Sequence, residues 1–309
     1  MRLVYLSMLA VLVSGSVIIT TIKAKEVFPI IEEKIPLFHT KVADTALLPV
    51  LQQSNNFPLL SAQGVLAVDV DSGVVMYEKD AGKPLLPAST TKIVTALTAV
   101  DNYDLDEVIT IADPSIPGQK MGLVPGEQMT VRDLIRGMLI YSANDAAEVL
   151  ADQYPDGREA FIERMNEKAQ RLAMFDSFFV NPSGLEDIGH VSTAKDLTRA
   201  ALIALQNPFL ADIVQTKRTV VQSVDGKFVH DLENTNELLG EVDGVLGVKT
   251  GWTENARENL VTYIDRNNHK IIIGLLGSQD RFGETKELIN WIFANYDWQH
   301  LEVPVYSTP

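Results

Sequence analysis

Two side chains that could act together as a nucleophile and its base stand three residues apart in Ser89-Thr90-Thr91-Lys92. Pro87 precedes them and an apolar run follows, which is the pattern of a helix entry. Residues three apart on a helix share a face, so the amine would lie within reach of the hydroxyl. A serine hydroxyl needs such a base, and burial can make a lysine one. Taken alone, the pair also fits a helix cap beside a solvated lysine.

Two further motifs offer the other groups that such a site needs. Ser142-Ala143-Asn144 supplies a hydroxyl for proton transfer and an amide that could hold the lysine or a substrate carbonyl. Lys249-Thr250-Gly251 supplies a cation, a hydroxyl for an anionic group and a glycine that lets the backbone approach a substrate. The first two motifs are weak alone, whereas Lys-Thr-Gly is rarer by chance and lies on a predicted strand. The order and the predicted structural context of all three together argue against coincidence.

The elements that must position these motifs follow from the hydrophobic pattern. Two strands joined by a turn are predicted before Ser89, helices in the middle of the chain, and three strands and a helix at its end. The predicted strands are 65–70, 74–78, 243–250, 258–265 and 270–276, and the predicted helices include 130–140, 157–174, 193–205 and 283–296. Strands at both ends around a helical insert indicate one composite domain with an antiparallel sheet.

The three motifs resemble those of the serine penicillin-recognising enzymes, and most closely the low-molecular-mass D-alanyl-D-alanine carboxypeptidases. The resemblance runs from about residue 64 to residue 296, with softer matches at 124–127, 181–185, 192–196 and 234–239. It implies an α+β fold of the β-lactamase/DD-peptidase type. In that fold an antiparallel sheet flanked by helices carries a mostly helical insert, and the active site lies at their interface. It implies no cofactor and no metal.

The resemblance also implies a set of catalytic roles. Ser89 would attack the carbonyl of the penultimate D-Ala in a peptidoglycan stem peptide and form an acyl-enzyme, as it would with β-lactam antibiotics. Lys92 would take the proton of Ser89. Ser142 would pass a proton toward the leaving D-Ala, and Asn144 would orient the substrate and Lys92. The enzyme would thus serve cell-wall synthesis and cell shape.

The remaining implied residues bind the substrate. Lys249 would keep the site positive, Thr250 would bind the terminal carboxylate, and Gly251 would allow a close approach. The N–H groups of Ser89 and Trp252 would form the oxyanion hole. Trp252 stands where several relatives have histidine, which changes the pocket wall. Lys195 stands where several have an arginine that holds the carboxylate, and it keeps the charge without the bidentate geometry.

Three alternatives use the same fold. A class A β-lactamase needs a Glu-x-x-Leu-Asn string between the second and third motifs, and no such string lies there. The segment 287–290 comes after the third motif and has the wrong spacing. A catalytically silent scaffold is disfavoured because all three motifs are intact. A DD-endopeptidase that cuts peptide cross-links stays open.

Composition restricts the other functional classes. The chain has 309 residues, 46% of them hydrophobic, which suffices for a substantial core. Its net charge of −15 argues against nucleic acid as a partner. The absence of cysteine excludes disulfides and thiolate metal sites, and five histidines without paired spacing do not indicate zinc.

The N-terminus indicates a membrane or export segment. An apolar run covers residues 3–22, close to the length of about 20 residues that spans a bilayer. It is longer than a signal-peptide core of about 7–15 residues, and no Ala-x-Ala cleavage site follows. We therefore expect residues 1–22 to form an uncleaved anchor with the catalytic part outside the cytoplasm, or a secreted protein if the segment is cleaved. A linker over 23–62, a catalytic domain over 63–300 and a tail over 301–309 complete the expected organisation.

Overall fold

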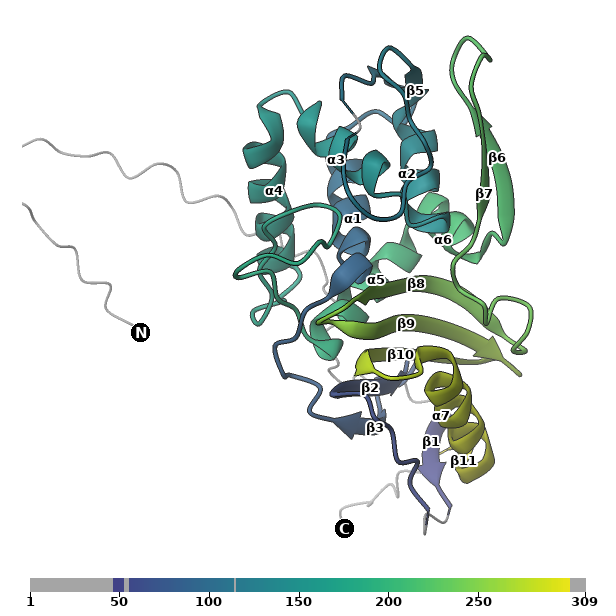
Figure 1. The fold of residues 1–309 in the computed structure, drawn as a ribbon. Helices are drawn as coiled ribbons and strands as arrows, with labels where there is room; N and C mark the ends of the chain where they lie inside the picture. Colours follow the sequence, from purple (N-terminus) through teal and green to yellow (C-terminus); the bar gives the residue numbers. More distant parts are fainter. Residues whose placement is uncertain (1–46, 53–55, 114, 301–309) are drawn as a thin grey trace, which may run out of the picture. The chain divides into compact units, whose positions relative to one another are not determined.

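The structure is a computed structural model that describes residues 47–52, 56–113 and 115–300 (Figure 1). The expected anchor at 1–22, the first part of the expected linker and the tail at 301–309 lie outside the described residues. Within the described ranges, every helix is too short or too polar to cross a membrane.

A five-stranded antiparallel sheet forms the centre of the fold, in the order β3-β2-β10-β9-β8. Its strands are β2 (Gly64–Asp69), β3 (Val75–Lys79), β8 (Val245–Thr253), β9 (Arg257–Arg266) and β10 (His269–Ser278). Successive side chains of a strand point to opposite faces, and here both faces are covered. On β10, Ile272 packs into the core on the helical side, whereas Ile271 and Ile273 pack into the core under the last helix.

The helices divide between the two faces of this sheet (Figure 1). The last helix, α7 (Arg281–Asn295), packs on one face through Leu288, Ile289 and Ile292. The other face carries the helical part of the chain. That part comprises the 3-10 turn η1 (Ala88–Thr91) and the helices α1 (Lys92–Asn102), α2 (Val131–Ile140), α3 (Asn144–Asp152), α4 (Gly157–Arg171), α5 (Ala194–Gln206) and α6 (Pro208–Gln215).

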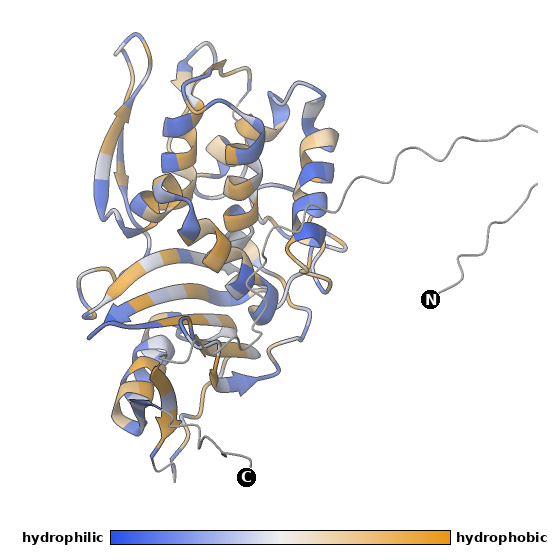
Figure 2. Ribbon diagram, turned by 180° about the vertical axis from the view of Figure 1, so that it is seen from behind, coloured by the Kyte–Doolittle hydropathy of each residue, from blue (hydrophilic) through white to orange (hydrophobic). Residues whose placement is uncertain are grey.

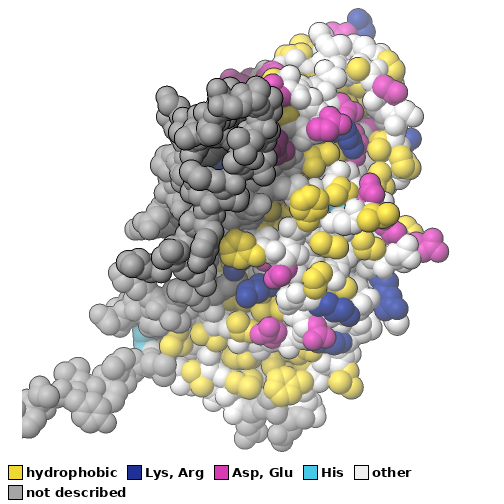
Figure 3. Space-filling model, turned by 90° about the vertical axis from the view of Figure 1, so that its left-hand side faces the viewer, with side chains coloured by type: hydrophobic (Ala, Val, Ile, Leu, Met, Phe, Trp, Pro, Cys, Tyr) yellow, Lys and Arg dark blue, Asp and Glu magenta, His cyan; other side chains and the backbone are white. Residues whose placement is uncertain are grey.

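Two short hairpins complete the helical part, formed by β4 (Val108–Thr110) with β5 (Gln128–Thr130) and by β6 (Arg218–Gln222) with β7 (Val229–Glu233). Figure 2 shows hydrophobic stretches along the central strands and hydrophilic residues on the outer helix α4. On the face in Figure 3, the described hydrophobic, acidic and basic side chains are interspersed.

Local signals explain where several elements begin. Thr130 caps α2 by accepting a hydrogen bond from the N–H of Asp133, and Thr193 caps α5 through the N–H of Asp196. The predicted strands and helices all form, with ends shifted by a few residues. The final helix ends at Asn295, and Tyr296 is the first residue of the strand that follows.

The expected linker over 23–62 needs a correction at its end. Leu47–Leu51 forms strand β1, which pairs antiparallel with β11 (Tyr296–His300), and Leu60 and Ala62 are buried in the core. Pro49 lies inside β1, and a proline is tolerated in a strand that has only one partner. Trp298 of β11 is tied to the main sheet because its indole N–H donates to the buried carboxylate of Asp69 over 2.8 Å.

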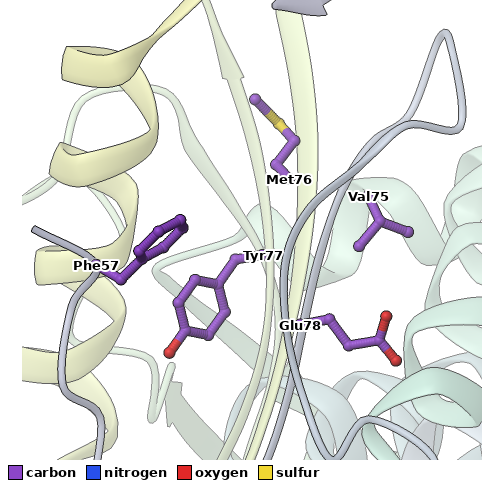
Figure 4. Close-up of a pocket in the computed structure, with 5 residues that line it drawn as sticks. All are labelled: Phe57, Val75, Met76, Tyr77 and Glu78. Atoms are coloured by element: carbon purple, nitrogen blue, oxygen red, sulfur yellow. The ribbon is translucent and has the colours of Figure 1, made fainter. Parts of the chain in front are cut away.

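One pocket lies beside the edge strand β3, far along the sheet order from β8. It has a volume of about 300 Å³ and is lined by Phe57, Val75, Met76, Tyr77 and Glu78 (Figure 4). None of the motif residues lines it.

Candidate active site

A strained backbone presents Ser89 at the start of the first helix. Ala88 has φ +48, in the left-handed region, and η1 follows it directly. Gly184 packs against this peptide so closely that a Cβ there would overlap the carbonyl oxygen of Ala88, and its own φ is +84. Asn181 shapes the loop around Gly184, because its Oδ1 accepts the N–H of Gly184 over 2.8 Å and that of Leu185 over 3.1 Å.

Lys92 lies fully buried beneath Ser89, with three oxygens around its amine. Its Nζ lies 2.8 Å from Ser89 Oγ, 2.7 Å from Asn144 Oδ1 and 2.5 Å from the carbonyl oxygen of Ser183. The last two oxygens can only accept. A neutral lysine has two protons and one lone pair, so when both protons go to these acceptors the lone pair faces the Ser89 hydroxyl. This geometry can remove the Ser89 proton.

The charge around Lys92 tunes the amine as a base. Burial lowers the pKa of Lys92 to about 7, and the carboxylates of Glu148 and Asp145 oppose that shift. Both acids are otherwise engaged, since Asp145 accepts backbone N–H groups from residues 121–123 and Glu148 pairs with Arg158. A lysine with a pKa near neutrality is suited to general base catalysis.

Asn144 is held in a single orientation at the start of α3. Its Nδ2 donates to the carbonyl of Pro117 over 2.9 Å, and its backbone N–H donates to that of Gln119 over 2.7 Å. These contacts direct Oδ1 toward Lys92 and fix the loop over 117–119 above the helical part of the site.

Ser142 and Lys249 join the helical part to the sheet. Ser142, in the left-handed region at φ +63, lies between α2 and α3. Lys249 Nζ lies 2.9 Å from Ser142 Oγ and 3.1 Å from the carbonyl of Thr250. Burial, with the positive charges of Lys92 and Arg281, lowers the pKa of Lys249 well below its ordinary value.

Strand β8 runs directly beside the nucleophile. A Cβ on Gly251 would lie 3.1 Å from the carbonyl oxygen of Pro87 and from the backbone nitrogens of Ser89 and Thr90. Glycine therefore allows the close approach of strand and turn. Trp252 follows in β8 with 61% of its surface exposed. Thr250 Oγ1 lies 2.6 Å from Oγ1 of Thr235.

The described hydrogen bonds of Lys195 do not include any residue of this cluster. Lys195 is exposed at the start of α5, where its N–H donates to the carbonyl of Ala81. Arg281, the first residue of α7, reaches the site instead: its Nη1 donates to the carbonyl of Gly251 over 3.3 Å. Burial lowers the pKa of Arg281, and its buried Nε has no partner among the described residues. A cation at a helix N-terminus is unfavourable because it opposes the helix dipole. An arginine at the start of a predicted helix is therefore a sequence signal that could have indicated a functional residue.

A buried histidine supports the turn before Lys92. His190 Nδ1 accepts the N–H of Val180 over 3.1 Å, and Nε2 lies 2.8 Å from Thr91 Oγ1. Nδ1 can accept only when it carries no proton, so this geometry holds the neutral ring. Burial lowers the pKa of His190 to about 4. Among the described residues, no group of three or more His, Asp or Glu side chains is placed to hold a metal ion.

A family described as D-alanyl-D-alanine carboxypeptidase matches residues 51–280. A D-alanyl-D-alanine carboxypeptidase of Bacillus subtilis is 32% identical over 247 residues, which are 76% of this chain and 63% of that protein. One from Mycobacterium tuberculosis is 32% identical over 243 residues, 75% of this chain and 82% of that protein. A D-alanyl-D-alanine endopeptidase of Pseudomonas aeruginosa is 32% identical over 241 residues, 75% of this chain and 77% of that one.

A similar solved structure is that of the Streptomyces K15 DD-transpeptidase. It superposes with a TM-score of 0.71 and 30% identity, over 77% of this chain and 99% of that one. The chain therefore spans nearly all of this solved structure but less than two thirds of the Bacillus subtilis relative.

Proposed function

This chain belongs to the D-alanyl-D-alanine carboxypeptidase family of serine peptidases, and on that premise we propose that it removes the terminal D-Ala from peptidoglycan stem peptides. One observation carries the proposal: two carbonyl oxygens accept the hydrogen bonds of neutral Lys92, so its lone pair faces Ser89. That arrangement supplies a nucleophile without histidine or metal.

Acylation begins when Ser89 Oγ attacks the carbonyl carbon of the penultimate D-Ala. The Ser89 proton moves to Lys92 Nζ as the carbon–oxygen bond forms, and the carbonyl oxygen takes up the negative charge. The N–H groups of Ser89 and Trp252 would hold that oxyanion, with β8 brought close by Gly251. The tetrahedral intermediate then breaks its bond to the amine of the terminal D-Ala.

The leaving amine needs a proton, and the pair formed by Ser142 and Lys249 can supply it. Ser142 Oγ donates its proton to the amine and recovers one from Lys249 Nζ, 2.9 Å away. The lowered pKa of Lys249 makes it a better acid than an ordinary lysine. We assign to this pair the proton transfer that the sequence assigned to Ser142 alone.

The terminal carboxylate of the substrate would lie against the cations of the sheet. Thr250 offers a hydroxyl, Lys249 an ammonium and Arg281 a guanidinium that already contacts Gly251. In this proposal Arg281 takes the carboxylate-binding role that the resemblance implied for Lys195. A negative charge here also favours the charged form of Lys249 and so prepares it as the acid.

After acylation Lys92 holds the Ser89 proton and Lys249 is neutral, so exchange with solvent must first remove the proton from Lys92 and return one to Lys249. Water then attacks the acyl carbon and gives a proton to neutral Lys92, which passes it to Ser89 Oγ as that oxygen leaves. β-Lactams acylate the same serine, but their leaving amine stays tethered to the adduct. The chain lacks the additional glutamate string of class A β-lactamases, so the penicillin adduct should persist while the peptide adduct turns over.

Incubation with a defined pentapeptide ending in D-Ala-D-Ala, followed by mass spectrometry, tests the proposal. The expected product is the tetrapeptide plus D-Ala, with no release by Ser89→Ala and normal release by the exposed control Ser115→Ala. Labelled penicillin should attach to the wild type and not to Ser89→Ala. Cleavage only of cross-linked peptides would make the enzyme an endopeptidase, and rapid penicilloate release without D-Ala would make it a β-lactamase.

We propose further that residues 1–22 hold the enzyme in the membrane with its catalytic domain outside the cytoplasm. The length of the apolar run and the missing cleavage site support this proposal. N-terminal sequencing of the protein from its host tests it, because a mature chain that begins after residue 22 would show a cleaved signal peptide.

A further inference from the structure

A second threonine lies directly behind the hydroxyl that is proposed to bind the substrate carboxylate. Thr235 Oγ1 is 2.6 Å from Thr250 Oγ1, a short distance for two hydroxyl groups. Thr235 is half-buried in the loop after β7, and Thr250 is buried in β8. No other hydrogen bond to either hydroxyl is found among the described residues.

Thr235 also contacts the helical side of the site. Its backbone N–H donates to the carbonyl of Ile140 over 3.2 Å, two residues before Ser142. The flanking asparagines fix this loop. Asn234 Nδ2 donates to the carbonyl of Thr216 over 2.9 Å, and Asn236 Oδ1 accepts the N–H of Leu238 over 3.1 Å. The side chain of Thr235 is thus held at a fixed place between the two sides.

The direction of the hydrogen bond between the threonines decides what Thr250 can do. A hydroxyl has one proton to donate, so Thr250 cannot give that proton both to Thr235 and to a carboxylate. When Thr235 donates to Thr250, the Thr250 proton is free and points toward the substrate. The same bond polarises the Thr250 hydroxyl and strengthens its own donation.

We propose that Thr235 is a positioning residue for carboxylate recognition, acting by donating its hydroxyl proton to Thr250. The inference rests on the proposed function, because it needs a substrate whose terminal carboxylate meets Thr250. Thr235 itself touches no reacting atom.

Three variants test the proposal, with a carboxylate substrate and a substrate that lacks one. Thr235→Val removes the hydroxyl at nearly constant shape, Thr235→Ser keeps it, and Thr219→Val is a matched control on β6. The first substrate is a pentapeptide ending in D-Ala-D-Ala. The second is an aryl ester of acetyl-D-alanine, whose Ser89-dependent hydrolysis is the rate lost in Ser89→Ala.

Thr235→Val should lower kcat/KM for the pentapeptide about fivefold, the effect of one neutral hydrogen bond, chiefly through a higher KM. The ester rate should stay within about twofold, since the ester has no carboxylate to recognise. Thr235→Ser and Thr219→Val should behave like the wild type with both substrates.

An equal loss with both substrates would show that Thr235 only supports the structure, and no loss with either would show that the bond does not matter. Both results overturn the inference while leaving the proposed function intact. A wild-type enzyme that releases no D-Ala would instead overturn the proposed function.

Discussion

The two sides of the active site each bury a lysine, but they surround it with opposite charges. On the helical side, Asp145 and Glu148 lie behind Lys92 and partly offset its burial, so its pKa settles at about 7. On the sheet side, Lys249 contacts neutral oxygens. Burial lowers the pKa of Lys249 well below its ordinary value, and the positive charges of Lys92 and Arg281 add to that shift.

This difference in surrounding charge indicates that the two lysines have different roles in the active site. The helical side carries its own compensating charge and can act as a base before the substrate arrives. The charges that act on Lys249 itself are cationic, although Glu258 and Glu237 act on the neighbouring Arg281. In the proposed reaction a substrate carboxylate would add negative charge next to Lys249. Substrate binding therefore completes the electrostatics of the second lysine but leaves those of the first largely unchanged.

Replacing Lys92 or Lys249 by methionine should give the largest effects and tests whether the two lysines have different roles. Lys92→Met should reduce acylation by roughly 10³- to 10⁴-fold with any substrate, because the base is lost. Lys249→Met should reduce it mainly with substrates that carry a carboxylate. Rapid-quench acylation by labelled penicillin and by the aryl ester of acetyl-D-alanine measures both effects. Equal losses of both variants with both substrates would contradict the comparison.

Glycines on the two sides should differ in how much they tolerate a methyl group. Gly184→Ala should destabilise the fold by about 3 kcal/mol, because it meets the Ala88 carbonyl and has φ +84. Gly251→Ala meets three backbone atoms at 3.1 Å without an unfavourable φ, so its main effect should be slower acylation.

Urea unfolding and penicillin binding separate these two effects. Gly82→Ala is the control, because a Cβ there has no neighbour within 4 Å. If Gly184→Ala is as stable as Gly82→Ala, the tight packing behind Ser89 is not what holds the turn.

The pH dependence of acylation should report the protonation state of Lys92 on the helical side. Only neutral Lys92 can accept the proton, so kcat/KM should rise about tenfold per pH unit as the pH increases toward its pKa of about 7. Glu148→Gln removes a charge that raises this pKa, so the midpoint should move to lower pH. Asp152→Asn is the control, because Asp152 contacts the same Arg158. A Glu148→Gln profile that coincides with that of the wild type would mean that the acids do not tune Lys92.

The smallest expected effect is on the KM of the substrate, and it should distinguish Arg281 from Lys195. Arg281→Ala should raise KM about tenfold for a peptide with a free carboxylate, through the loss of one charge-assisted contact. Lys195→Ala should leave KM unchanged, because Lys195 lies exposed on α5. Steady-state assays of D-Ala release decide this. A higher KM for Lys195→Ala alone would restore the assignment made from the sequence.

Much of the molecule could be predicted from sequence because its signals are local. The family, the α+β fold and the serine-peptidase class are confirmed. Thr130 and Thr193 marked two helix starts through capping, and the strands of the central sheet followed from their apolar runs.

The features that sequence could not reveal depend on residues far apart in the chain. Leu47–Leu51 finds its partner near residue 300, and nothing within the segment itself indicates that pairing. Arg281 and Thr235 belong to the site only because the start of α7 and the loop after β7 lie beside β8. Lys195 matched a family position, and its part in carboxylate binding stays a prediction.

The pairing of β1 with β11 has a mechanical consequence. β1 has β11 as its sole partner strand in the described chain, and Leu47 is the first residue of that pair, opposite His300. A pull on the chain ahead of Leu47 would therefore load this two-stranded ribbon first. The ribbon can peel apart while the Trp298 bond to Asp69 still holds β11 on the sheet. Tension from an attached surface would be absorbed there, before it could disturb the spacing between Ser89 and Lys92.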